Sequence, residues 1–279
     1  MVSWPQGTPV SFVVPHLGPL QEGRLVARWD RFIAEAKLSD GRVVRAHCVN
    51  PGRMEGLVEA GRRLWVRHAP SKTRKLAYTW ELVEHTDVNG KPIVIGANTQ
   101  APNRIVGALL RAQVIPGLRR YSALRAEVRD GARRLDFLLE GKTRRFVEVK
   151  NCHLVYPDGR AYFPDTVSER ATAHLHHLIE VVQRGQRAEV LFCVQRPDAL
   201  RSIRPSAAHD PAFAEGCRQA AQAGVGFRAI QVRPTLEGYA WMGTVPVDLK
   251  TYDASAHGTW IAAGRTLGGW KRSKKAKAT

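Results

Sequence analysis

Apolar and polar residues alternate through most of the first hundred positions, a pattern typical of strands with one buried face. Asp40-Gly41 and Asn89-Gly90 lie where hairpin turns would join such strands. The predicted strands are 24–30, 31–38, 42–49, 63–69, 76–85 and 91–96. Short strands at this spacing favour a small β-barrel. An OB-fold is the expected type because such barrels often hold nucleic acid, although an SH3-like barrel would give a similar pattern.

After residue 100 the pattern changes to alternating strands and helices, which predicts an α/β domain. A helix capped by Asn103 is expected at 103–112, and a second helix at 167–184, where Thr166 and Glu169 have capping-box spacing. Asp210 followed by Pro211 predicts the start of a third helix, which ends at Gly224. The predicted strands are 123–128, 133–140, 144–150, 188–195 and 224–234.

Composition narrows the class of protein. Hydrophobic residues make up 44% of the 279 positions, which is ordinary for a globular chain. No apolar run reaches the roughly 18–20 residues of a membrane helix, and the first residues lack a secretory pattern, so we expect no membrane association. The four cysteines form no CxxC pair, which argues against a zinc ribbon and a redox pair and fits a reduced, cytoplasmic compartment.

Charge is the first feature that points to a partner. Lys and Arg number 43 against 25 Asp and Glu, a net charge of +18. The last nine residues contribute five positive charges, so +13 remains in the rest of the chain. An excess spread this widely favours a polyanionic partner, with nucleic acid the leading class. A soluble protein from an Arg-rich proteome is the alternative.

Three residues form the sharpest chemical pattern. Glu148 and Lys150 are two apart on a predicted strand and therefore share a face, while Asp136 lies on the preceding strand of the same hairpin. Two carboxylates at one point suit Mg²⁺ or Mn²⁺, and a neighbouring lysine can stabilise charge during phosphodiester hydrolysis. Glu127, upstream, is a candidate third carboxylate. The tripeptide alone would more often be a surface salt bridge on an exposed strand face, and the Asp-containing strand before it and the helix after it favour the site.

Several ordered motifs resemble one family. FVEVKN, YFPDTVSER and HLHHL resemble the sugar fermentation stimulation protein A (SfsA) family, as do HCVNPGRM, SKTRKLAYTWEL and NTQAPNRIV, and the similarity runs from about residue 22 to about 249. The resemblance implies an α+β protein of two domains that binds DNA. These are an N-terminal OB-fold-like β-barrel (1–100) and a C-terminal α/β domain like the PD-(D/E)xK nucleases (101–249). Residues 250–279 lie beyond it, and we expect a basic, disordered extension there.

By position, Asp136, Glu148 and Lys150 match the nuclease core that the resemblance implies, with Asp136 and Glu148 as metal ligands. Glu127 matches the upstream acidic position. The chain departs from the family pattern after Arg170, where Ala171-Thr172-Ala173 replaces Gly-x-Lys and removes one phosphate contact. The sequence leaves open whether this domain cleaves DNA.

Basic residues around the two domains are candidates for nucleic-acid contacts, and so is the helix histidine His174. The set is Arg53, Lys72, Arg74, Lys75, Arg104, Arg170 and His174. The histidines at 174, 176 and 177 lack the partners of a zinc site, so a solvated or phosphate-facing helix surface is expected. Asp165 and Glu169 fit equally as caps or as partners of Lys150 and Arg170, and Trp80 fits the barrel core as well as base stacking.

The sequence favours a DNA-binding protein built on a nuclease fold. An active metal-dependent endonuclease is the first alternative, and a single-stranded nucleic-acid or RNA-binding module is the second. The sequence does not decide whether the chain forms a homodimer.

Overall fold

The N-terminal part of the chain, up to Gly96, folds into a barrel of short strands, as the alternation predicts. This computed structural model describes residues 12–87, 89–266 and 269–272. The barrel strands are β2 (Leu20–Trp29), β3 (Ile33–Leu38), β4 (Val43–His47), β5 (Arg63–His68), β6 (Tyr78–Thr86) and β7 (Pro92–Gly96). They follow the order β4-β3-β2-β5-β6-β7, and a parallel pairing between β4 and β6 closes the barrel. Trp80 is fully buried in its interior, so it belongs to the core.

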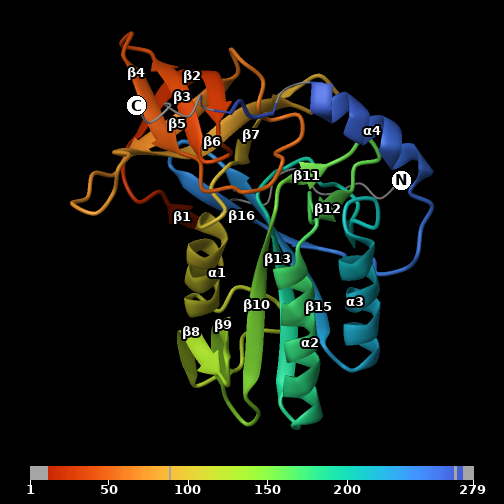
Figure 1. The fold of residues 1–279 in the computed structure, drawn as a ribbon. Coiled ribbons are helices and arrows are strands. Elements are labelled where there is room, and N and C mark those ends of the chain that lie inside the picture. Colours follow the sequence, from red (N-terminus) through yellow and green to blue (C-terminus); the bar gives the residue numbers. More distant parts are fainter. Residues whose placement is uncertain (1–11, 88, 267–268, 273–279) are drawn as a thin grey trace, which may run out of the picture.

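The C-terminal half is built on a seven-stranded mixed sheet (Figure 1). Its strands, in spatial order, are β1 (Val13–Pro15), β16 (Gly238–Val245), β15 (Gly226–Pro234), β13 (Arg187–Val194), β10 (Arg145–Cys152), β9 (Arg133–Glu140) and β8 (Ala123–Asp130). Strand β1 therefore crosses from the N-terminus into this second sheet, pairing antiparallel with β16. A small third sheet contains β11 (Leu154–Val155), β12 (Ala161–Phe163) and β14 (Ile203–Pro205).

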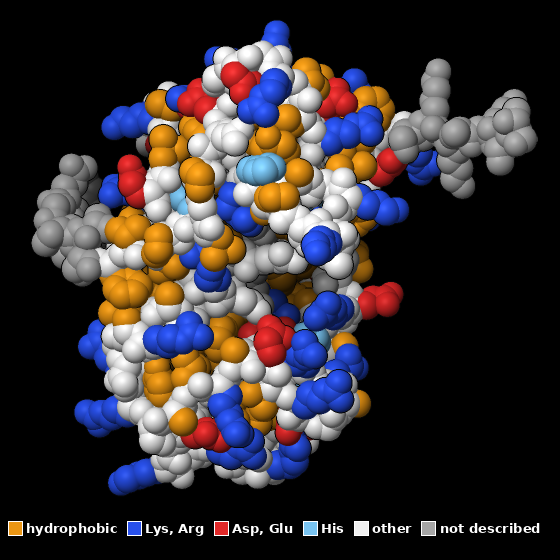
Figure 2. All heavy atoms as spheres, turned by 90° about the vertical axis from the view of Figure 1, so that its left-hand side faces the viewer, with side chains coloured by type: hydrophobic (Ala, Val, Ile, Leu, Met, Phe, Trp, Pro, Cys, Tyr) orange, Lys and Arg blue, Asp and Glu red, His pale blue; other side chains and the backbone are white. Residues whose placement is uncertain are grey.

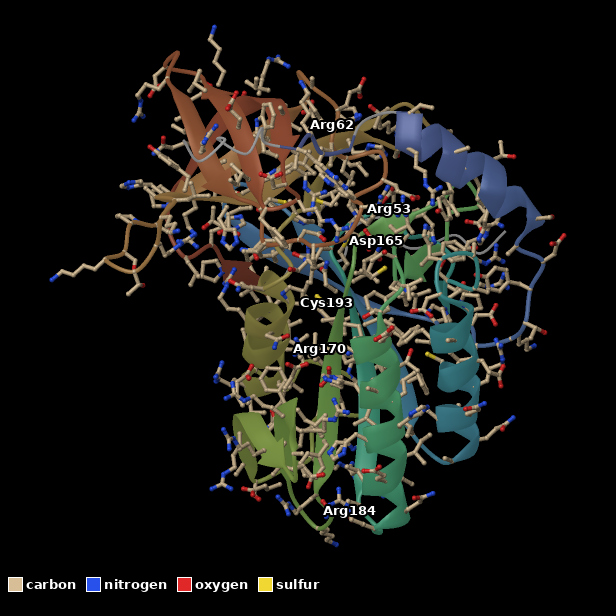
Figure 3. All side chains as sticks on the ribbon, in the orientation of Figure 1. Arg53, Arg62, Asp165, Arg170, Arg184 and Cys193 are labelled. Atoms are coloured by element: carbon tan, nitrogen blue, oxygen red, sulfur yellow. The ribbon has the colours of Figure 1, made fainter. Side chains whose placement is uncertain are left out.

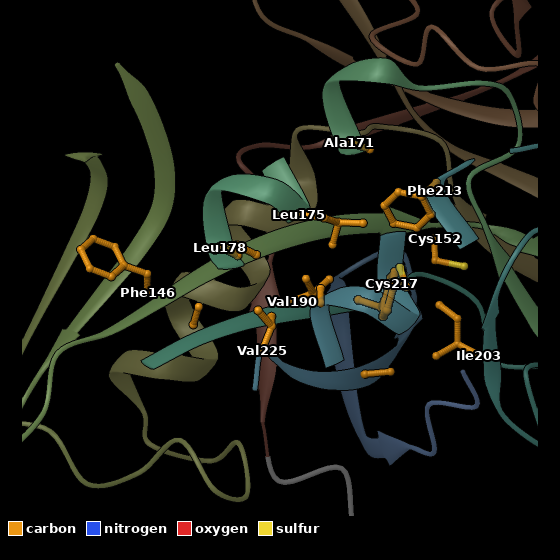
Figure 4. Packing of buried hydrophobic residues seen from close by; sticks show 14 of the residues in the cluster. Phe146, Cys152, Ala171, Leu175, Leu178, Val190, Ile203, Phe213, Cys217 and Val225 are labelled. Carbon is orange, nitrogen blue, oxygen red and sulfur yellow. The ribbon is translucent and has the colours of Figure 1, made fainter. Parts of the chain in front are cut away.

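Helices cover both faces of the large sheet. Helix α1 (Ala101–Arg111) packs on one face with Val147 and Leu191. Helices α2 (Glu169–Gln183) and α3 (Pro211–Gln222) pack on the other, where Phe146, Val190 and Phe213 lie in one cluster (Figure 4). Because β10 and β13 are covered on both sides, both are buried along almost their whole length.

Two helix starts differ from the predictions. Helix α1 begins at Ala101 with Gln100 as its N-cap, so Asn103 lies inside the first turn and its side chain is free for another role. Helix α2 is capped by Ser168, whose side chain accepts from Ala171 N, rather than by Thr166. The third start is confirmed, because Asp210 caps α3 and accepts from Phe213 N.

The segment after residue 250 contains a helix where the sequence predicted a disordered extension. Helix α4 (Ser255–Thr266) packs Ile261 and Trp260 against Tyr156 and Tyr162. Its Gly264 carbonyl accepts from Gly56 N of the barrel at 3.3 Å, so α4 contacts both domains. The prediction rested on charge and glycine content and missed this aromatic contact. Residues 273–279 of the basic tail lie outside the described residues. No helix of the described ranges has the length and hydrophobicity needed to cross a bilayer.

Candidate metal and nucleic-acid site

Asp136 lies where two strands of the sheet separate. The ladder between β9 and β10 ends at the pair Val147–Phe137. Asp136 is the next residue of β9 beyond this last pair. The carboxylate then takes the place of the next backbone acceptor: its Oδ2 accepts from Val149 N at 2.7 Å. Its Oδ1 accepts from Asn103 Nδ2 at 2.6 Å, which ties it to the first turn of α1. The strand opening therefore holds Asp136 beside the middle of β10.

Glu148 and Lys150 point to the same face of β10, as their spacing predicts. Lys150 Nζ donates to Glu148 Oε1 at 2.7 Å, and His174 of α2 contacts the same oxygen through Nδ1. Both β10 side chains are buried, at 4% and 8% exposure. Burial alone would raise the pKa of Glu148, but His174 and Lys150 outweigh it and hold this pKa below its usual value. Glu148 is therefore a charged, buried carboxylate.

Asp136 has the opposite electrostatic balance. Burial and the nearby negative charge of Glu148 raise its pKa from 3.8 to about 6, although the hydrogen bonds from Val149 and Asn103 favour the charged form. A carboxyl whose charge is disfavoured by a charged carboxylate beside it is typical of functional sites, since a bound cation relieves the repulsion.

The donor chemistry fits a hard divalent cation. Asp136 and Glu148 supply carboxylate oxygens, the ligand type that Mg²⁺ and Mn²⁺ prefer. In the described part of the chain, no group of three or more His, Cys, Asp or Glu side chains is arranged to hold a metal ion. A cation at this point would thus be held by two protein carboxylates with water in its other positions, which is usual for Mg²⁺.

We expect Asp136→Asn to stabilise the protein. When folding raises the pKa of a carboxyl, the free energy of unfolding of the protein falls as pH rises. For Asp136 this fall runs from the pKa of the unfolded chain, near 4, to the pKa of the folded protein, about 6. At about 1.4 kcal/mol per pKa unit, the cost at pH 7.5 is roughly 2–3 kcal/mol. The asparagine avoids this cost but keeps only one of the two hydrogen bonds that the carboxylate accepts, a loss of about 1 kcal/mol, so the expected net gain is roughly 1–2 kcal/mol. Chemical denaturation in EDTA at pH 7.5 should show the gain, and the gain should vanish below pH 4. Equal stability of the two proteins at pH 7.5 would show that Asp136 is not destabilised by its surroundings.

The structure does not bring Glu127 to this point. The pairing of β8 with β9 skips Glu127 and Asp136, which lie between the pairs Ala126–Phe137 and Val128–Leu135. The backbone of Glu127 has a positive φ of 54°, and its side chain is exposed. Its carboxylate accepts from Arg134 at 3.3 Å instead. Glu127 is therefore a neighbour of Asp136 in the sheet, but it is not a third carboxylate beside Asp136 and Glu148.

His174 lies differently from its expected place on a solvated helix surface. It is 7% exposed, and its ring bonds to Glu148. His177 is similarly buried, with Nε2 2.9 Å from Asp130. The helix period placed both on one face, but the acidic partners come from strands 26 and 47 residues away in sequence and give no local signal.

The predicted basic residues form two groups. Arg53 and Arg170 are exposed, and Figure 3 shows Arg53 near Asp165 where the barrel meets the sheet domain, above Arg170 at the start of α2. Lys72 and Lys75 are exposed in the loop between β5 and β6. The other group, Arg74 and Arg104, is part-buried and lines a cavity between the barrel and the first turn of α1.

Asp165 joins the two domains. Its Oδ2 accepts from Met54 N at 3.1 Å and lies 3.4 Å from His153 Nε2. Burial would raise the pKa of Asp165, but His153 and the Met54 amide overcome it and lower this pKa to about 2. A Cβ on Gly52 would lie 2.4 Å from the carboxylate oxygens, so only glycine permits this approach. Asp165 is thus neither a cap nor a partner of Lys150 or Arg170.

Arg28 is a structural residue that the sequence did not reveal. It is 1% exposed on β2, and its guanidinium donates to the backbone carbonyls of Asn50 at 2.6 Å and Gly52 at 3.1 Å. It fixes the loop that carries Arg53 and receives Asp165. An arginine in an alternating strand reads as solvent-facing, so only the three-dimensional contact identifies it.

Comparisons with known proteins agree with this architecture. Residues 26–95 match the family model described as the SfsA N-terminal OB domain, and residues 100–238 match the sugar fermentation stimulation protein RE domain. The two-domain fold class predicted from sequence is confirmed.

Relatives match along most of the chain. A sugar fermentation stimulation protein homolog of Halorhodospira halophila is 44% identical over 225 residues, covering 78% of this chain and 91% of the relative. One of Thioalkalivibrio sulfidiphilus is 41% identical, covering 83% and 96%. The solved structure of Pyrococcus furiosus SfsA in complex with Ca²⁺ is similar with a TM-score of 0.76 and 25% identity, covering 85% of this chain and all of that one. The chain therefore belongs to the sugar fermentation stimulation protein family.

Proposed function

We propose that this protein binds DNA across the junction of its two domains and holds a divalent cation, Mg²⁺ or Mn²⁺, at Asp136 and Glu148. The observation that carries the proposal is the convergence of the half-buried Asp136 and the buried Glu148 with Lys150, inside a chain of net charge +18. Nucleic-acid phosphates fit both features. They attract arginine and lysine side chains, and their oxygen atoms can bind hard cations.

The distribution of positive charge supports a long polyanion as ligand. Figure 2 shows Lys and Arg side chains over both the barrel and the sheet domain, with the surface hollowed between them. Exposed arginines and lysines grip phosphates without reading sequence, so affinity would come largely from the backbone. The relative with bound Ca²⁺ adds support for a cation in this family.

Hydrolysis of a phosphodiester bond is the second candidate function, and Lys150 favours it. Its ammonium group lies 2.7 Å from Glu148 Oε1 on the same face of β10. A cation bound there would lower the pKa of a water and neutralise phosphoryl charge. Lys150 would stabilise the negative charge that develops on the phosphate oxygens, while His174 keeps Glu148 charged and oriented.

Replacing Arg53 and Arg170 by glutamine tests the location of the DNA. Each arginine that contacts a phosphate should lower the slope of log K against log salt by about one, and the double variant by about two. Fluorescence anisotropy with a labelled duplex measures both. Arg218→Gln is the matched control. Arg218 pairs with Glu215 on α3, a different helix from the one that carries Arg170, so this variant should leave the slope unchanged. An unchanged slope in the double variant would move the DNA elsewhere.

A further inference from the structure

A cavity lies between the barrel and the first turn of α1, apart from Glu148 and Lys150. Its volume is about 470 Å³, within the range of small-ligand pockets. Arg67, Arg74 and Arg104 line it together with the acidic residue Glu81. The polar part comes from β5, β6, the loop between them and α1, while Leu17 and Val49 supply apolar surface.

The charges in this cavity do not cancel. Glu81 is already satisfied, since its Oε1 accepts from Arg67 Nε at 2.9 Å and its Oε2 from Asn98 Nδ2 at 2.8 Å. One positive and one negative charge are therefore consumed in a buried pair. Arg74 and Arg104 remain, and both face the same space.

Neither remaining arginine has an acidic partner among the described residues. Arg74 donates to two neutral acceptors, Thr79 Oγ1 at 2.7 Å and the Ala69 carbonyl at 3.3 Å. Arg104 donates to the Pro15 carbonyl and lies over the ring of Tyr239. A part-buried guanidinium held by neutral groups keeps its full charge available to an anion.

Two further features shape the cavity, the positive end of a helix and a flat ring. The cavity is lined by Gln100 and Ala101 at the N-terminus of α1, and this helix has no acidic residue in its first turn and no side-chain cap. His47 also lines the cavity, and burial together with Arg74 lowers its pKa, so its ring is neutral at pH 7 and presents a flat surface. The cavity thus combines a cationic end with a ring and apolar side chains.

We propose that this cavity binds one nucleotide, with its phosphate between Arg74 and Arg104 and its base toward His47 and Val49. A phosphate alone would leave much of the volume empty, whereas a nucleotide matches both the cationic and the apolar parts. The inference rests on the proposed function in that the nucleotide is either an unpaired unit of bound nucleic acid or a free mononucleotide. Arg104 follows Asn103, the residue that holds Asp136, so one helical turn serves both sites.

Calorimetric titration of the full chain with each of the four deoxynucleoside 5′-monophosphates tests this assignment. Wild type should show saturable binding, and the nucleosides and inorganic phosphate should each bind at least tenfold more weakly. Arg74→Gln combined with Arg104→Gln should lower nucleotide affinity about 100-fold, because each lost charge-assisted bond is worth about a factor of ten. Arg24→Gln is the control: it removes the same charge from an exposed barrel arginine that does not line the cavity.

Competition identifies the source of the nucleotide. Displacement of the monophosphate by a short single-stranded oligonucleotide would assign the cavity to nucleic acid, and simultaneous binding of both would assign it to a free nucleotide. Three results would each overturn the inference. They are no saturable binding of nucleotide, undiminished affinity in a double variant whose thermal unfolding is unchanged, and equal affinity for inorganic phosphate. Duplex binding by the same samples is scored separately. Retained DNA binding without nucleotide binding rejects only this inference, and the reverse result rejects only the proposed function.

Discussion

We expect Glu148→Gln to weaken metal binding strongly while leaving the fold intact. Wild type should bind one Mn²⁺ per chain, and the glutamine should weaken this binding by more than roughly 100-fold, because loss of a partner that only orients a ligand already costs 10–100-fold. The amide keeps the size of the side chain and an oxygen that can accept from Lys150. Titration followed by electron paramagnetic resonance measures free Mn²⁺ directly.

A nearby carboxylate provides the control. Glu140 lies on β9, the same strand as Asp136, but its carboxylate is at the surface, 3.6 Å from Arg125. The control variant is Glu140→Gln. This variant should bind Mn²⁺ as wild type does. If Glu148→Gln also retained wild-type affinity, the cation would have to lie elsewhere and the ligand assignment would fail.

DNA affinity should fall steeply with salt. The chain has a net charge of +18, of which +13 lies before its last nine residues, so it can neutralise several phosphates at once, and each releases bound counterions. If the interface contacts 6–10 phosphates, affinity should drop by roughly 10³- to 10⁵-fold between 50 and 200 mM salt. Anisotropy titrations at four salt concentrations give the slope.

Truncation separates the contribution of the tail. Removing residues 273–279 eliminates three lysines and leaves α4 and the described part of the chain after it unchanged. We expect the slope to decrease by no more than about three and to remain steep. A slope near zero in the truncated protein would place the binding charge in the tail rather than across the domains, and an affinity independent of salt in the full chain would refute the electrostatic account.

The sequence was most informative where local pattern and tertiary role coincide. Alternation on β10 places Glu148 and Lys150 on one face, and the continuous apolar run of β13 predicts a strand covered on both sides. The cap at Asp210 depends only on neighbouring residues and was predicted for the same reason.

The structure differs from the sequence predictions where contacts join residues that are distant in sequence. Asn103 has the chemistry of a cap, but its side chain holds Asp136, 33 residues away. Asp165 resembles a helix cap, yet it accepts from Met54 N, 111 residues away, because Gly52 lets the barrel approach. Helix α4 contains glycines and stands near a basic tail, and its aromatic packing on Tyr156 stabilises it. None of these contacts has a periodic signature along the chain.

DNA binding by the full chain, with cleavage scored in the same samples, tests the central claim most directly. Labelled single- and double-stranded DNA would be incubated at low salt with wild type or Glu148→Gln in Mg²⁺, Mn²⁺ or EDTA, and each sample divided between a native and a denaturing gel. We predict that both proteins retard DNA, and any strand cutting should require metal and be absent in Glu148→Gln. Failure of wild type to retard either form of DNA at low salt would contradict the account.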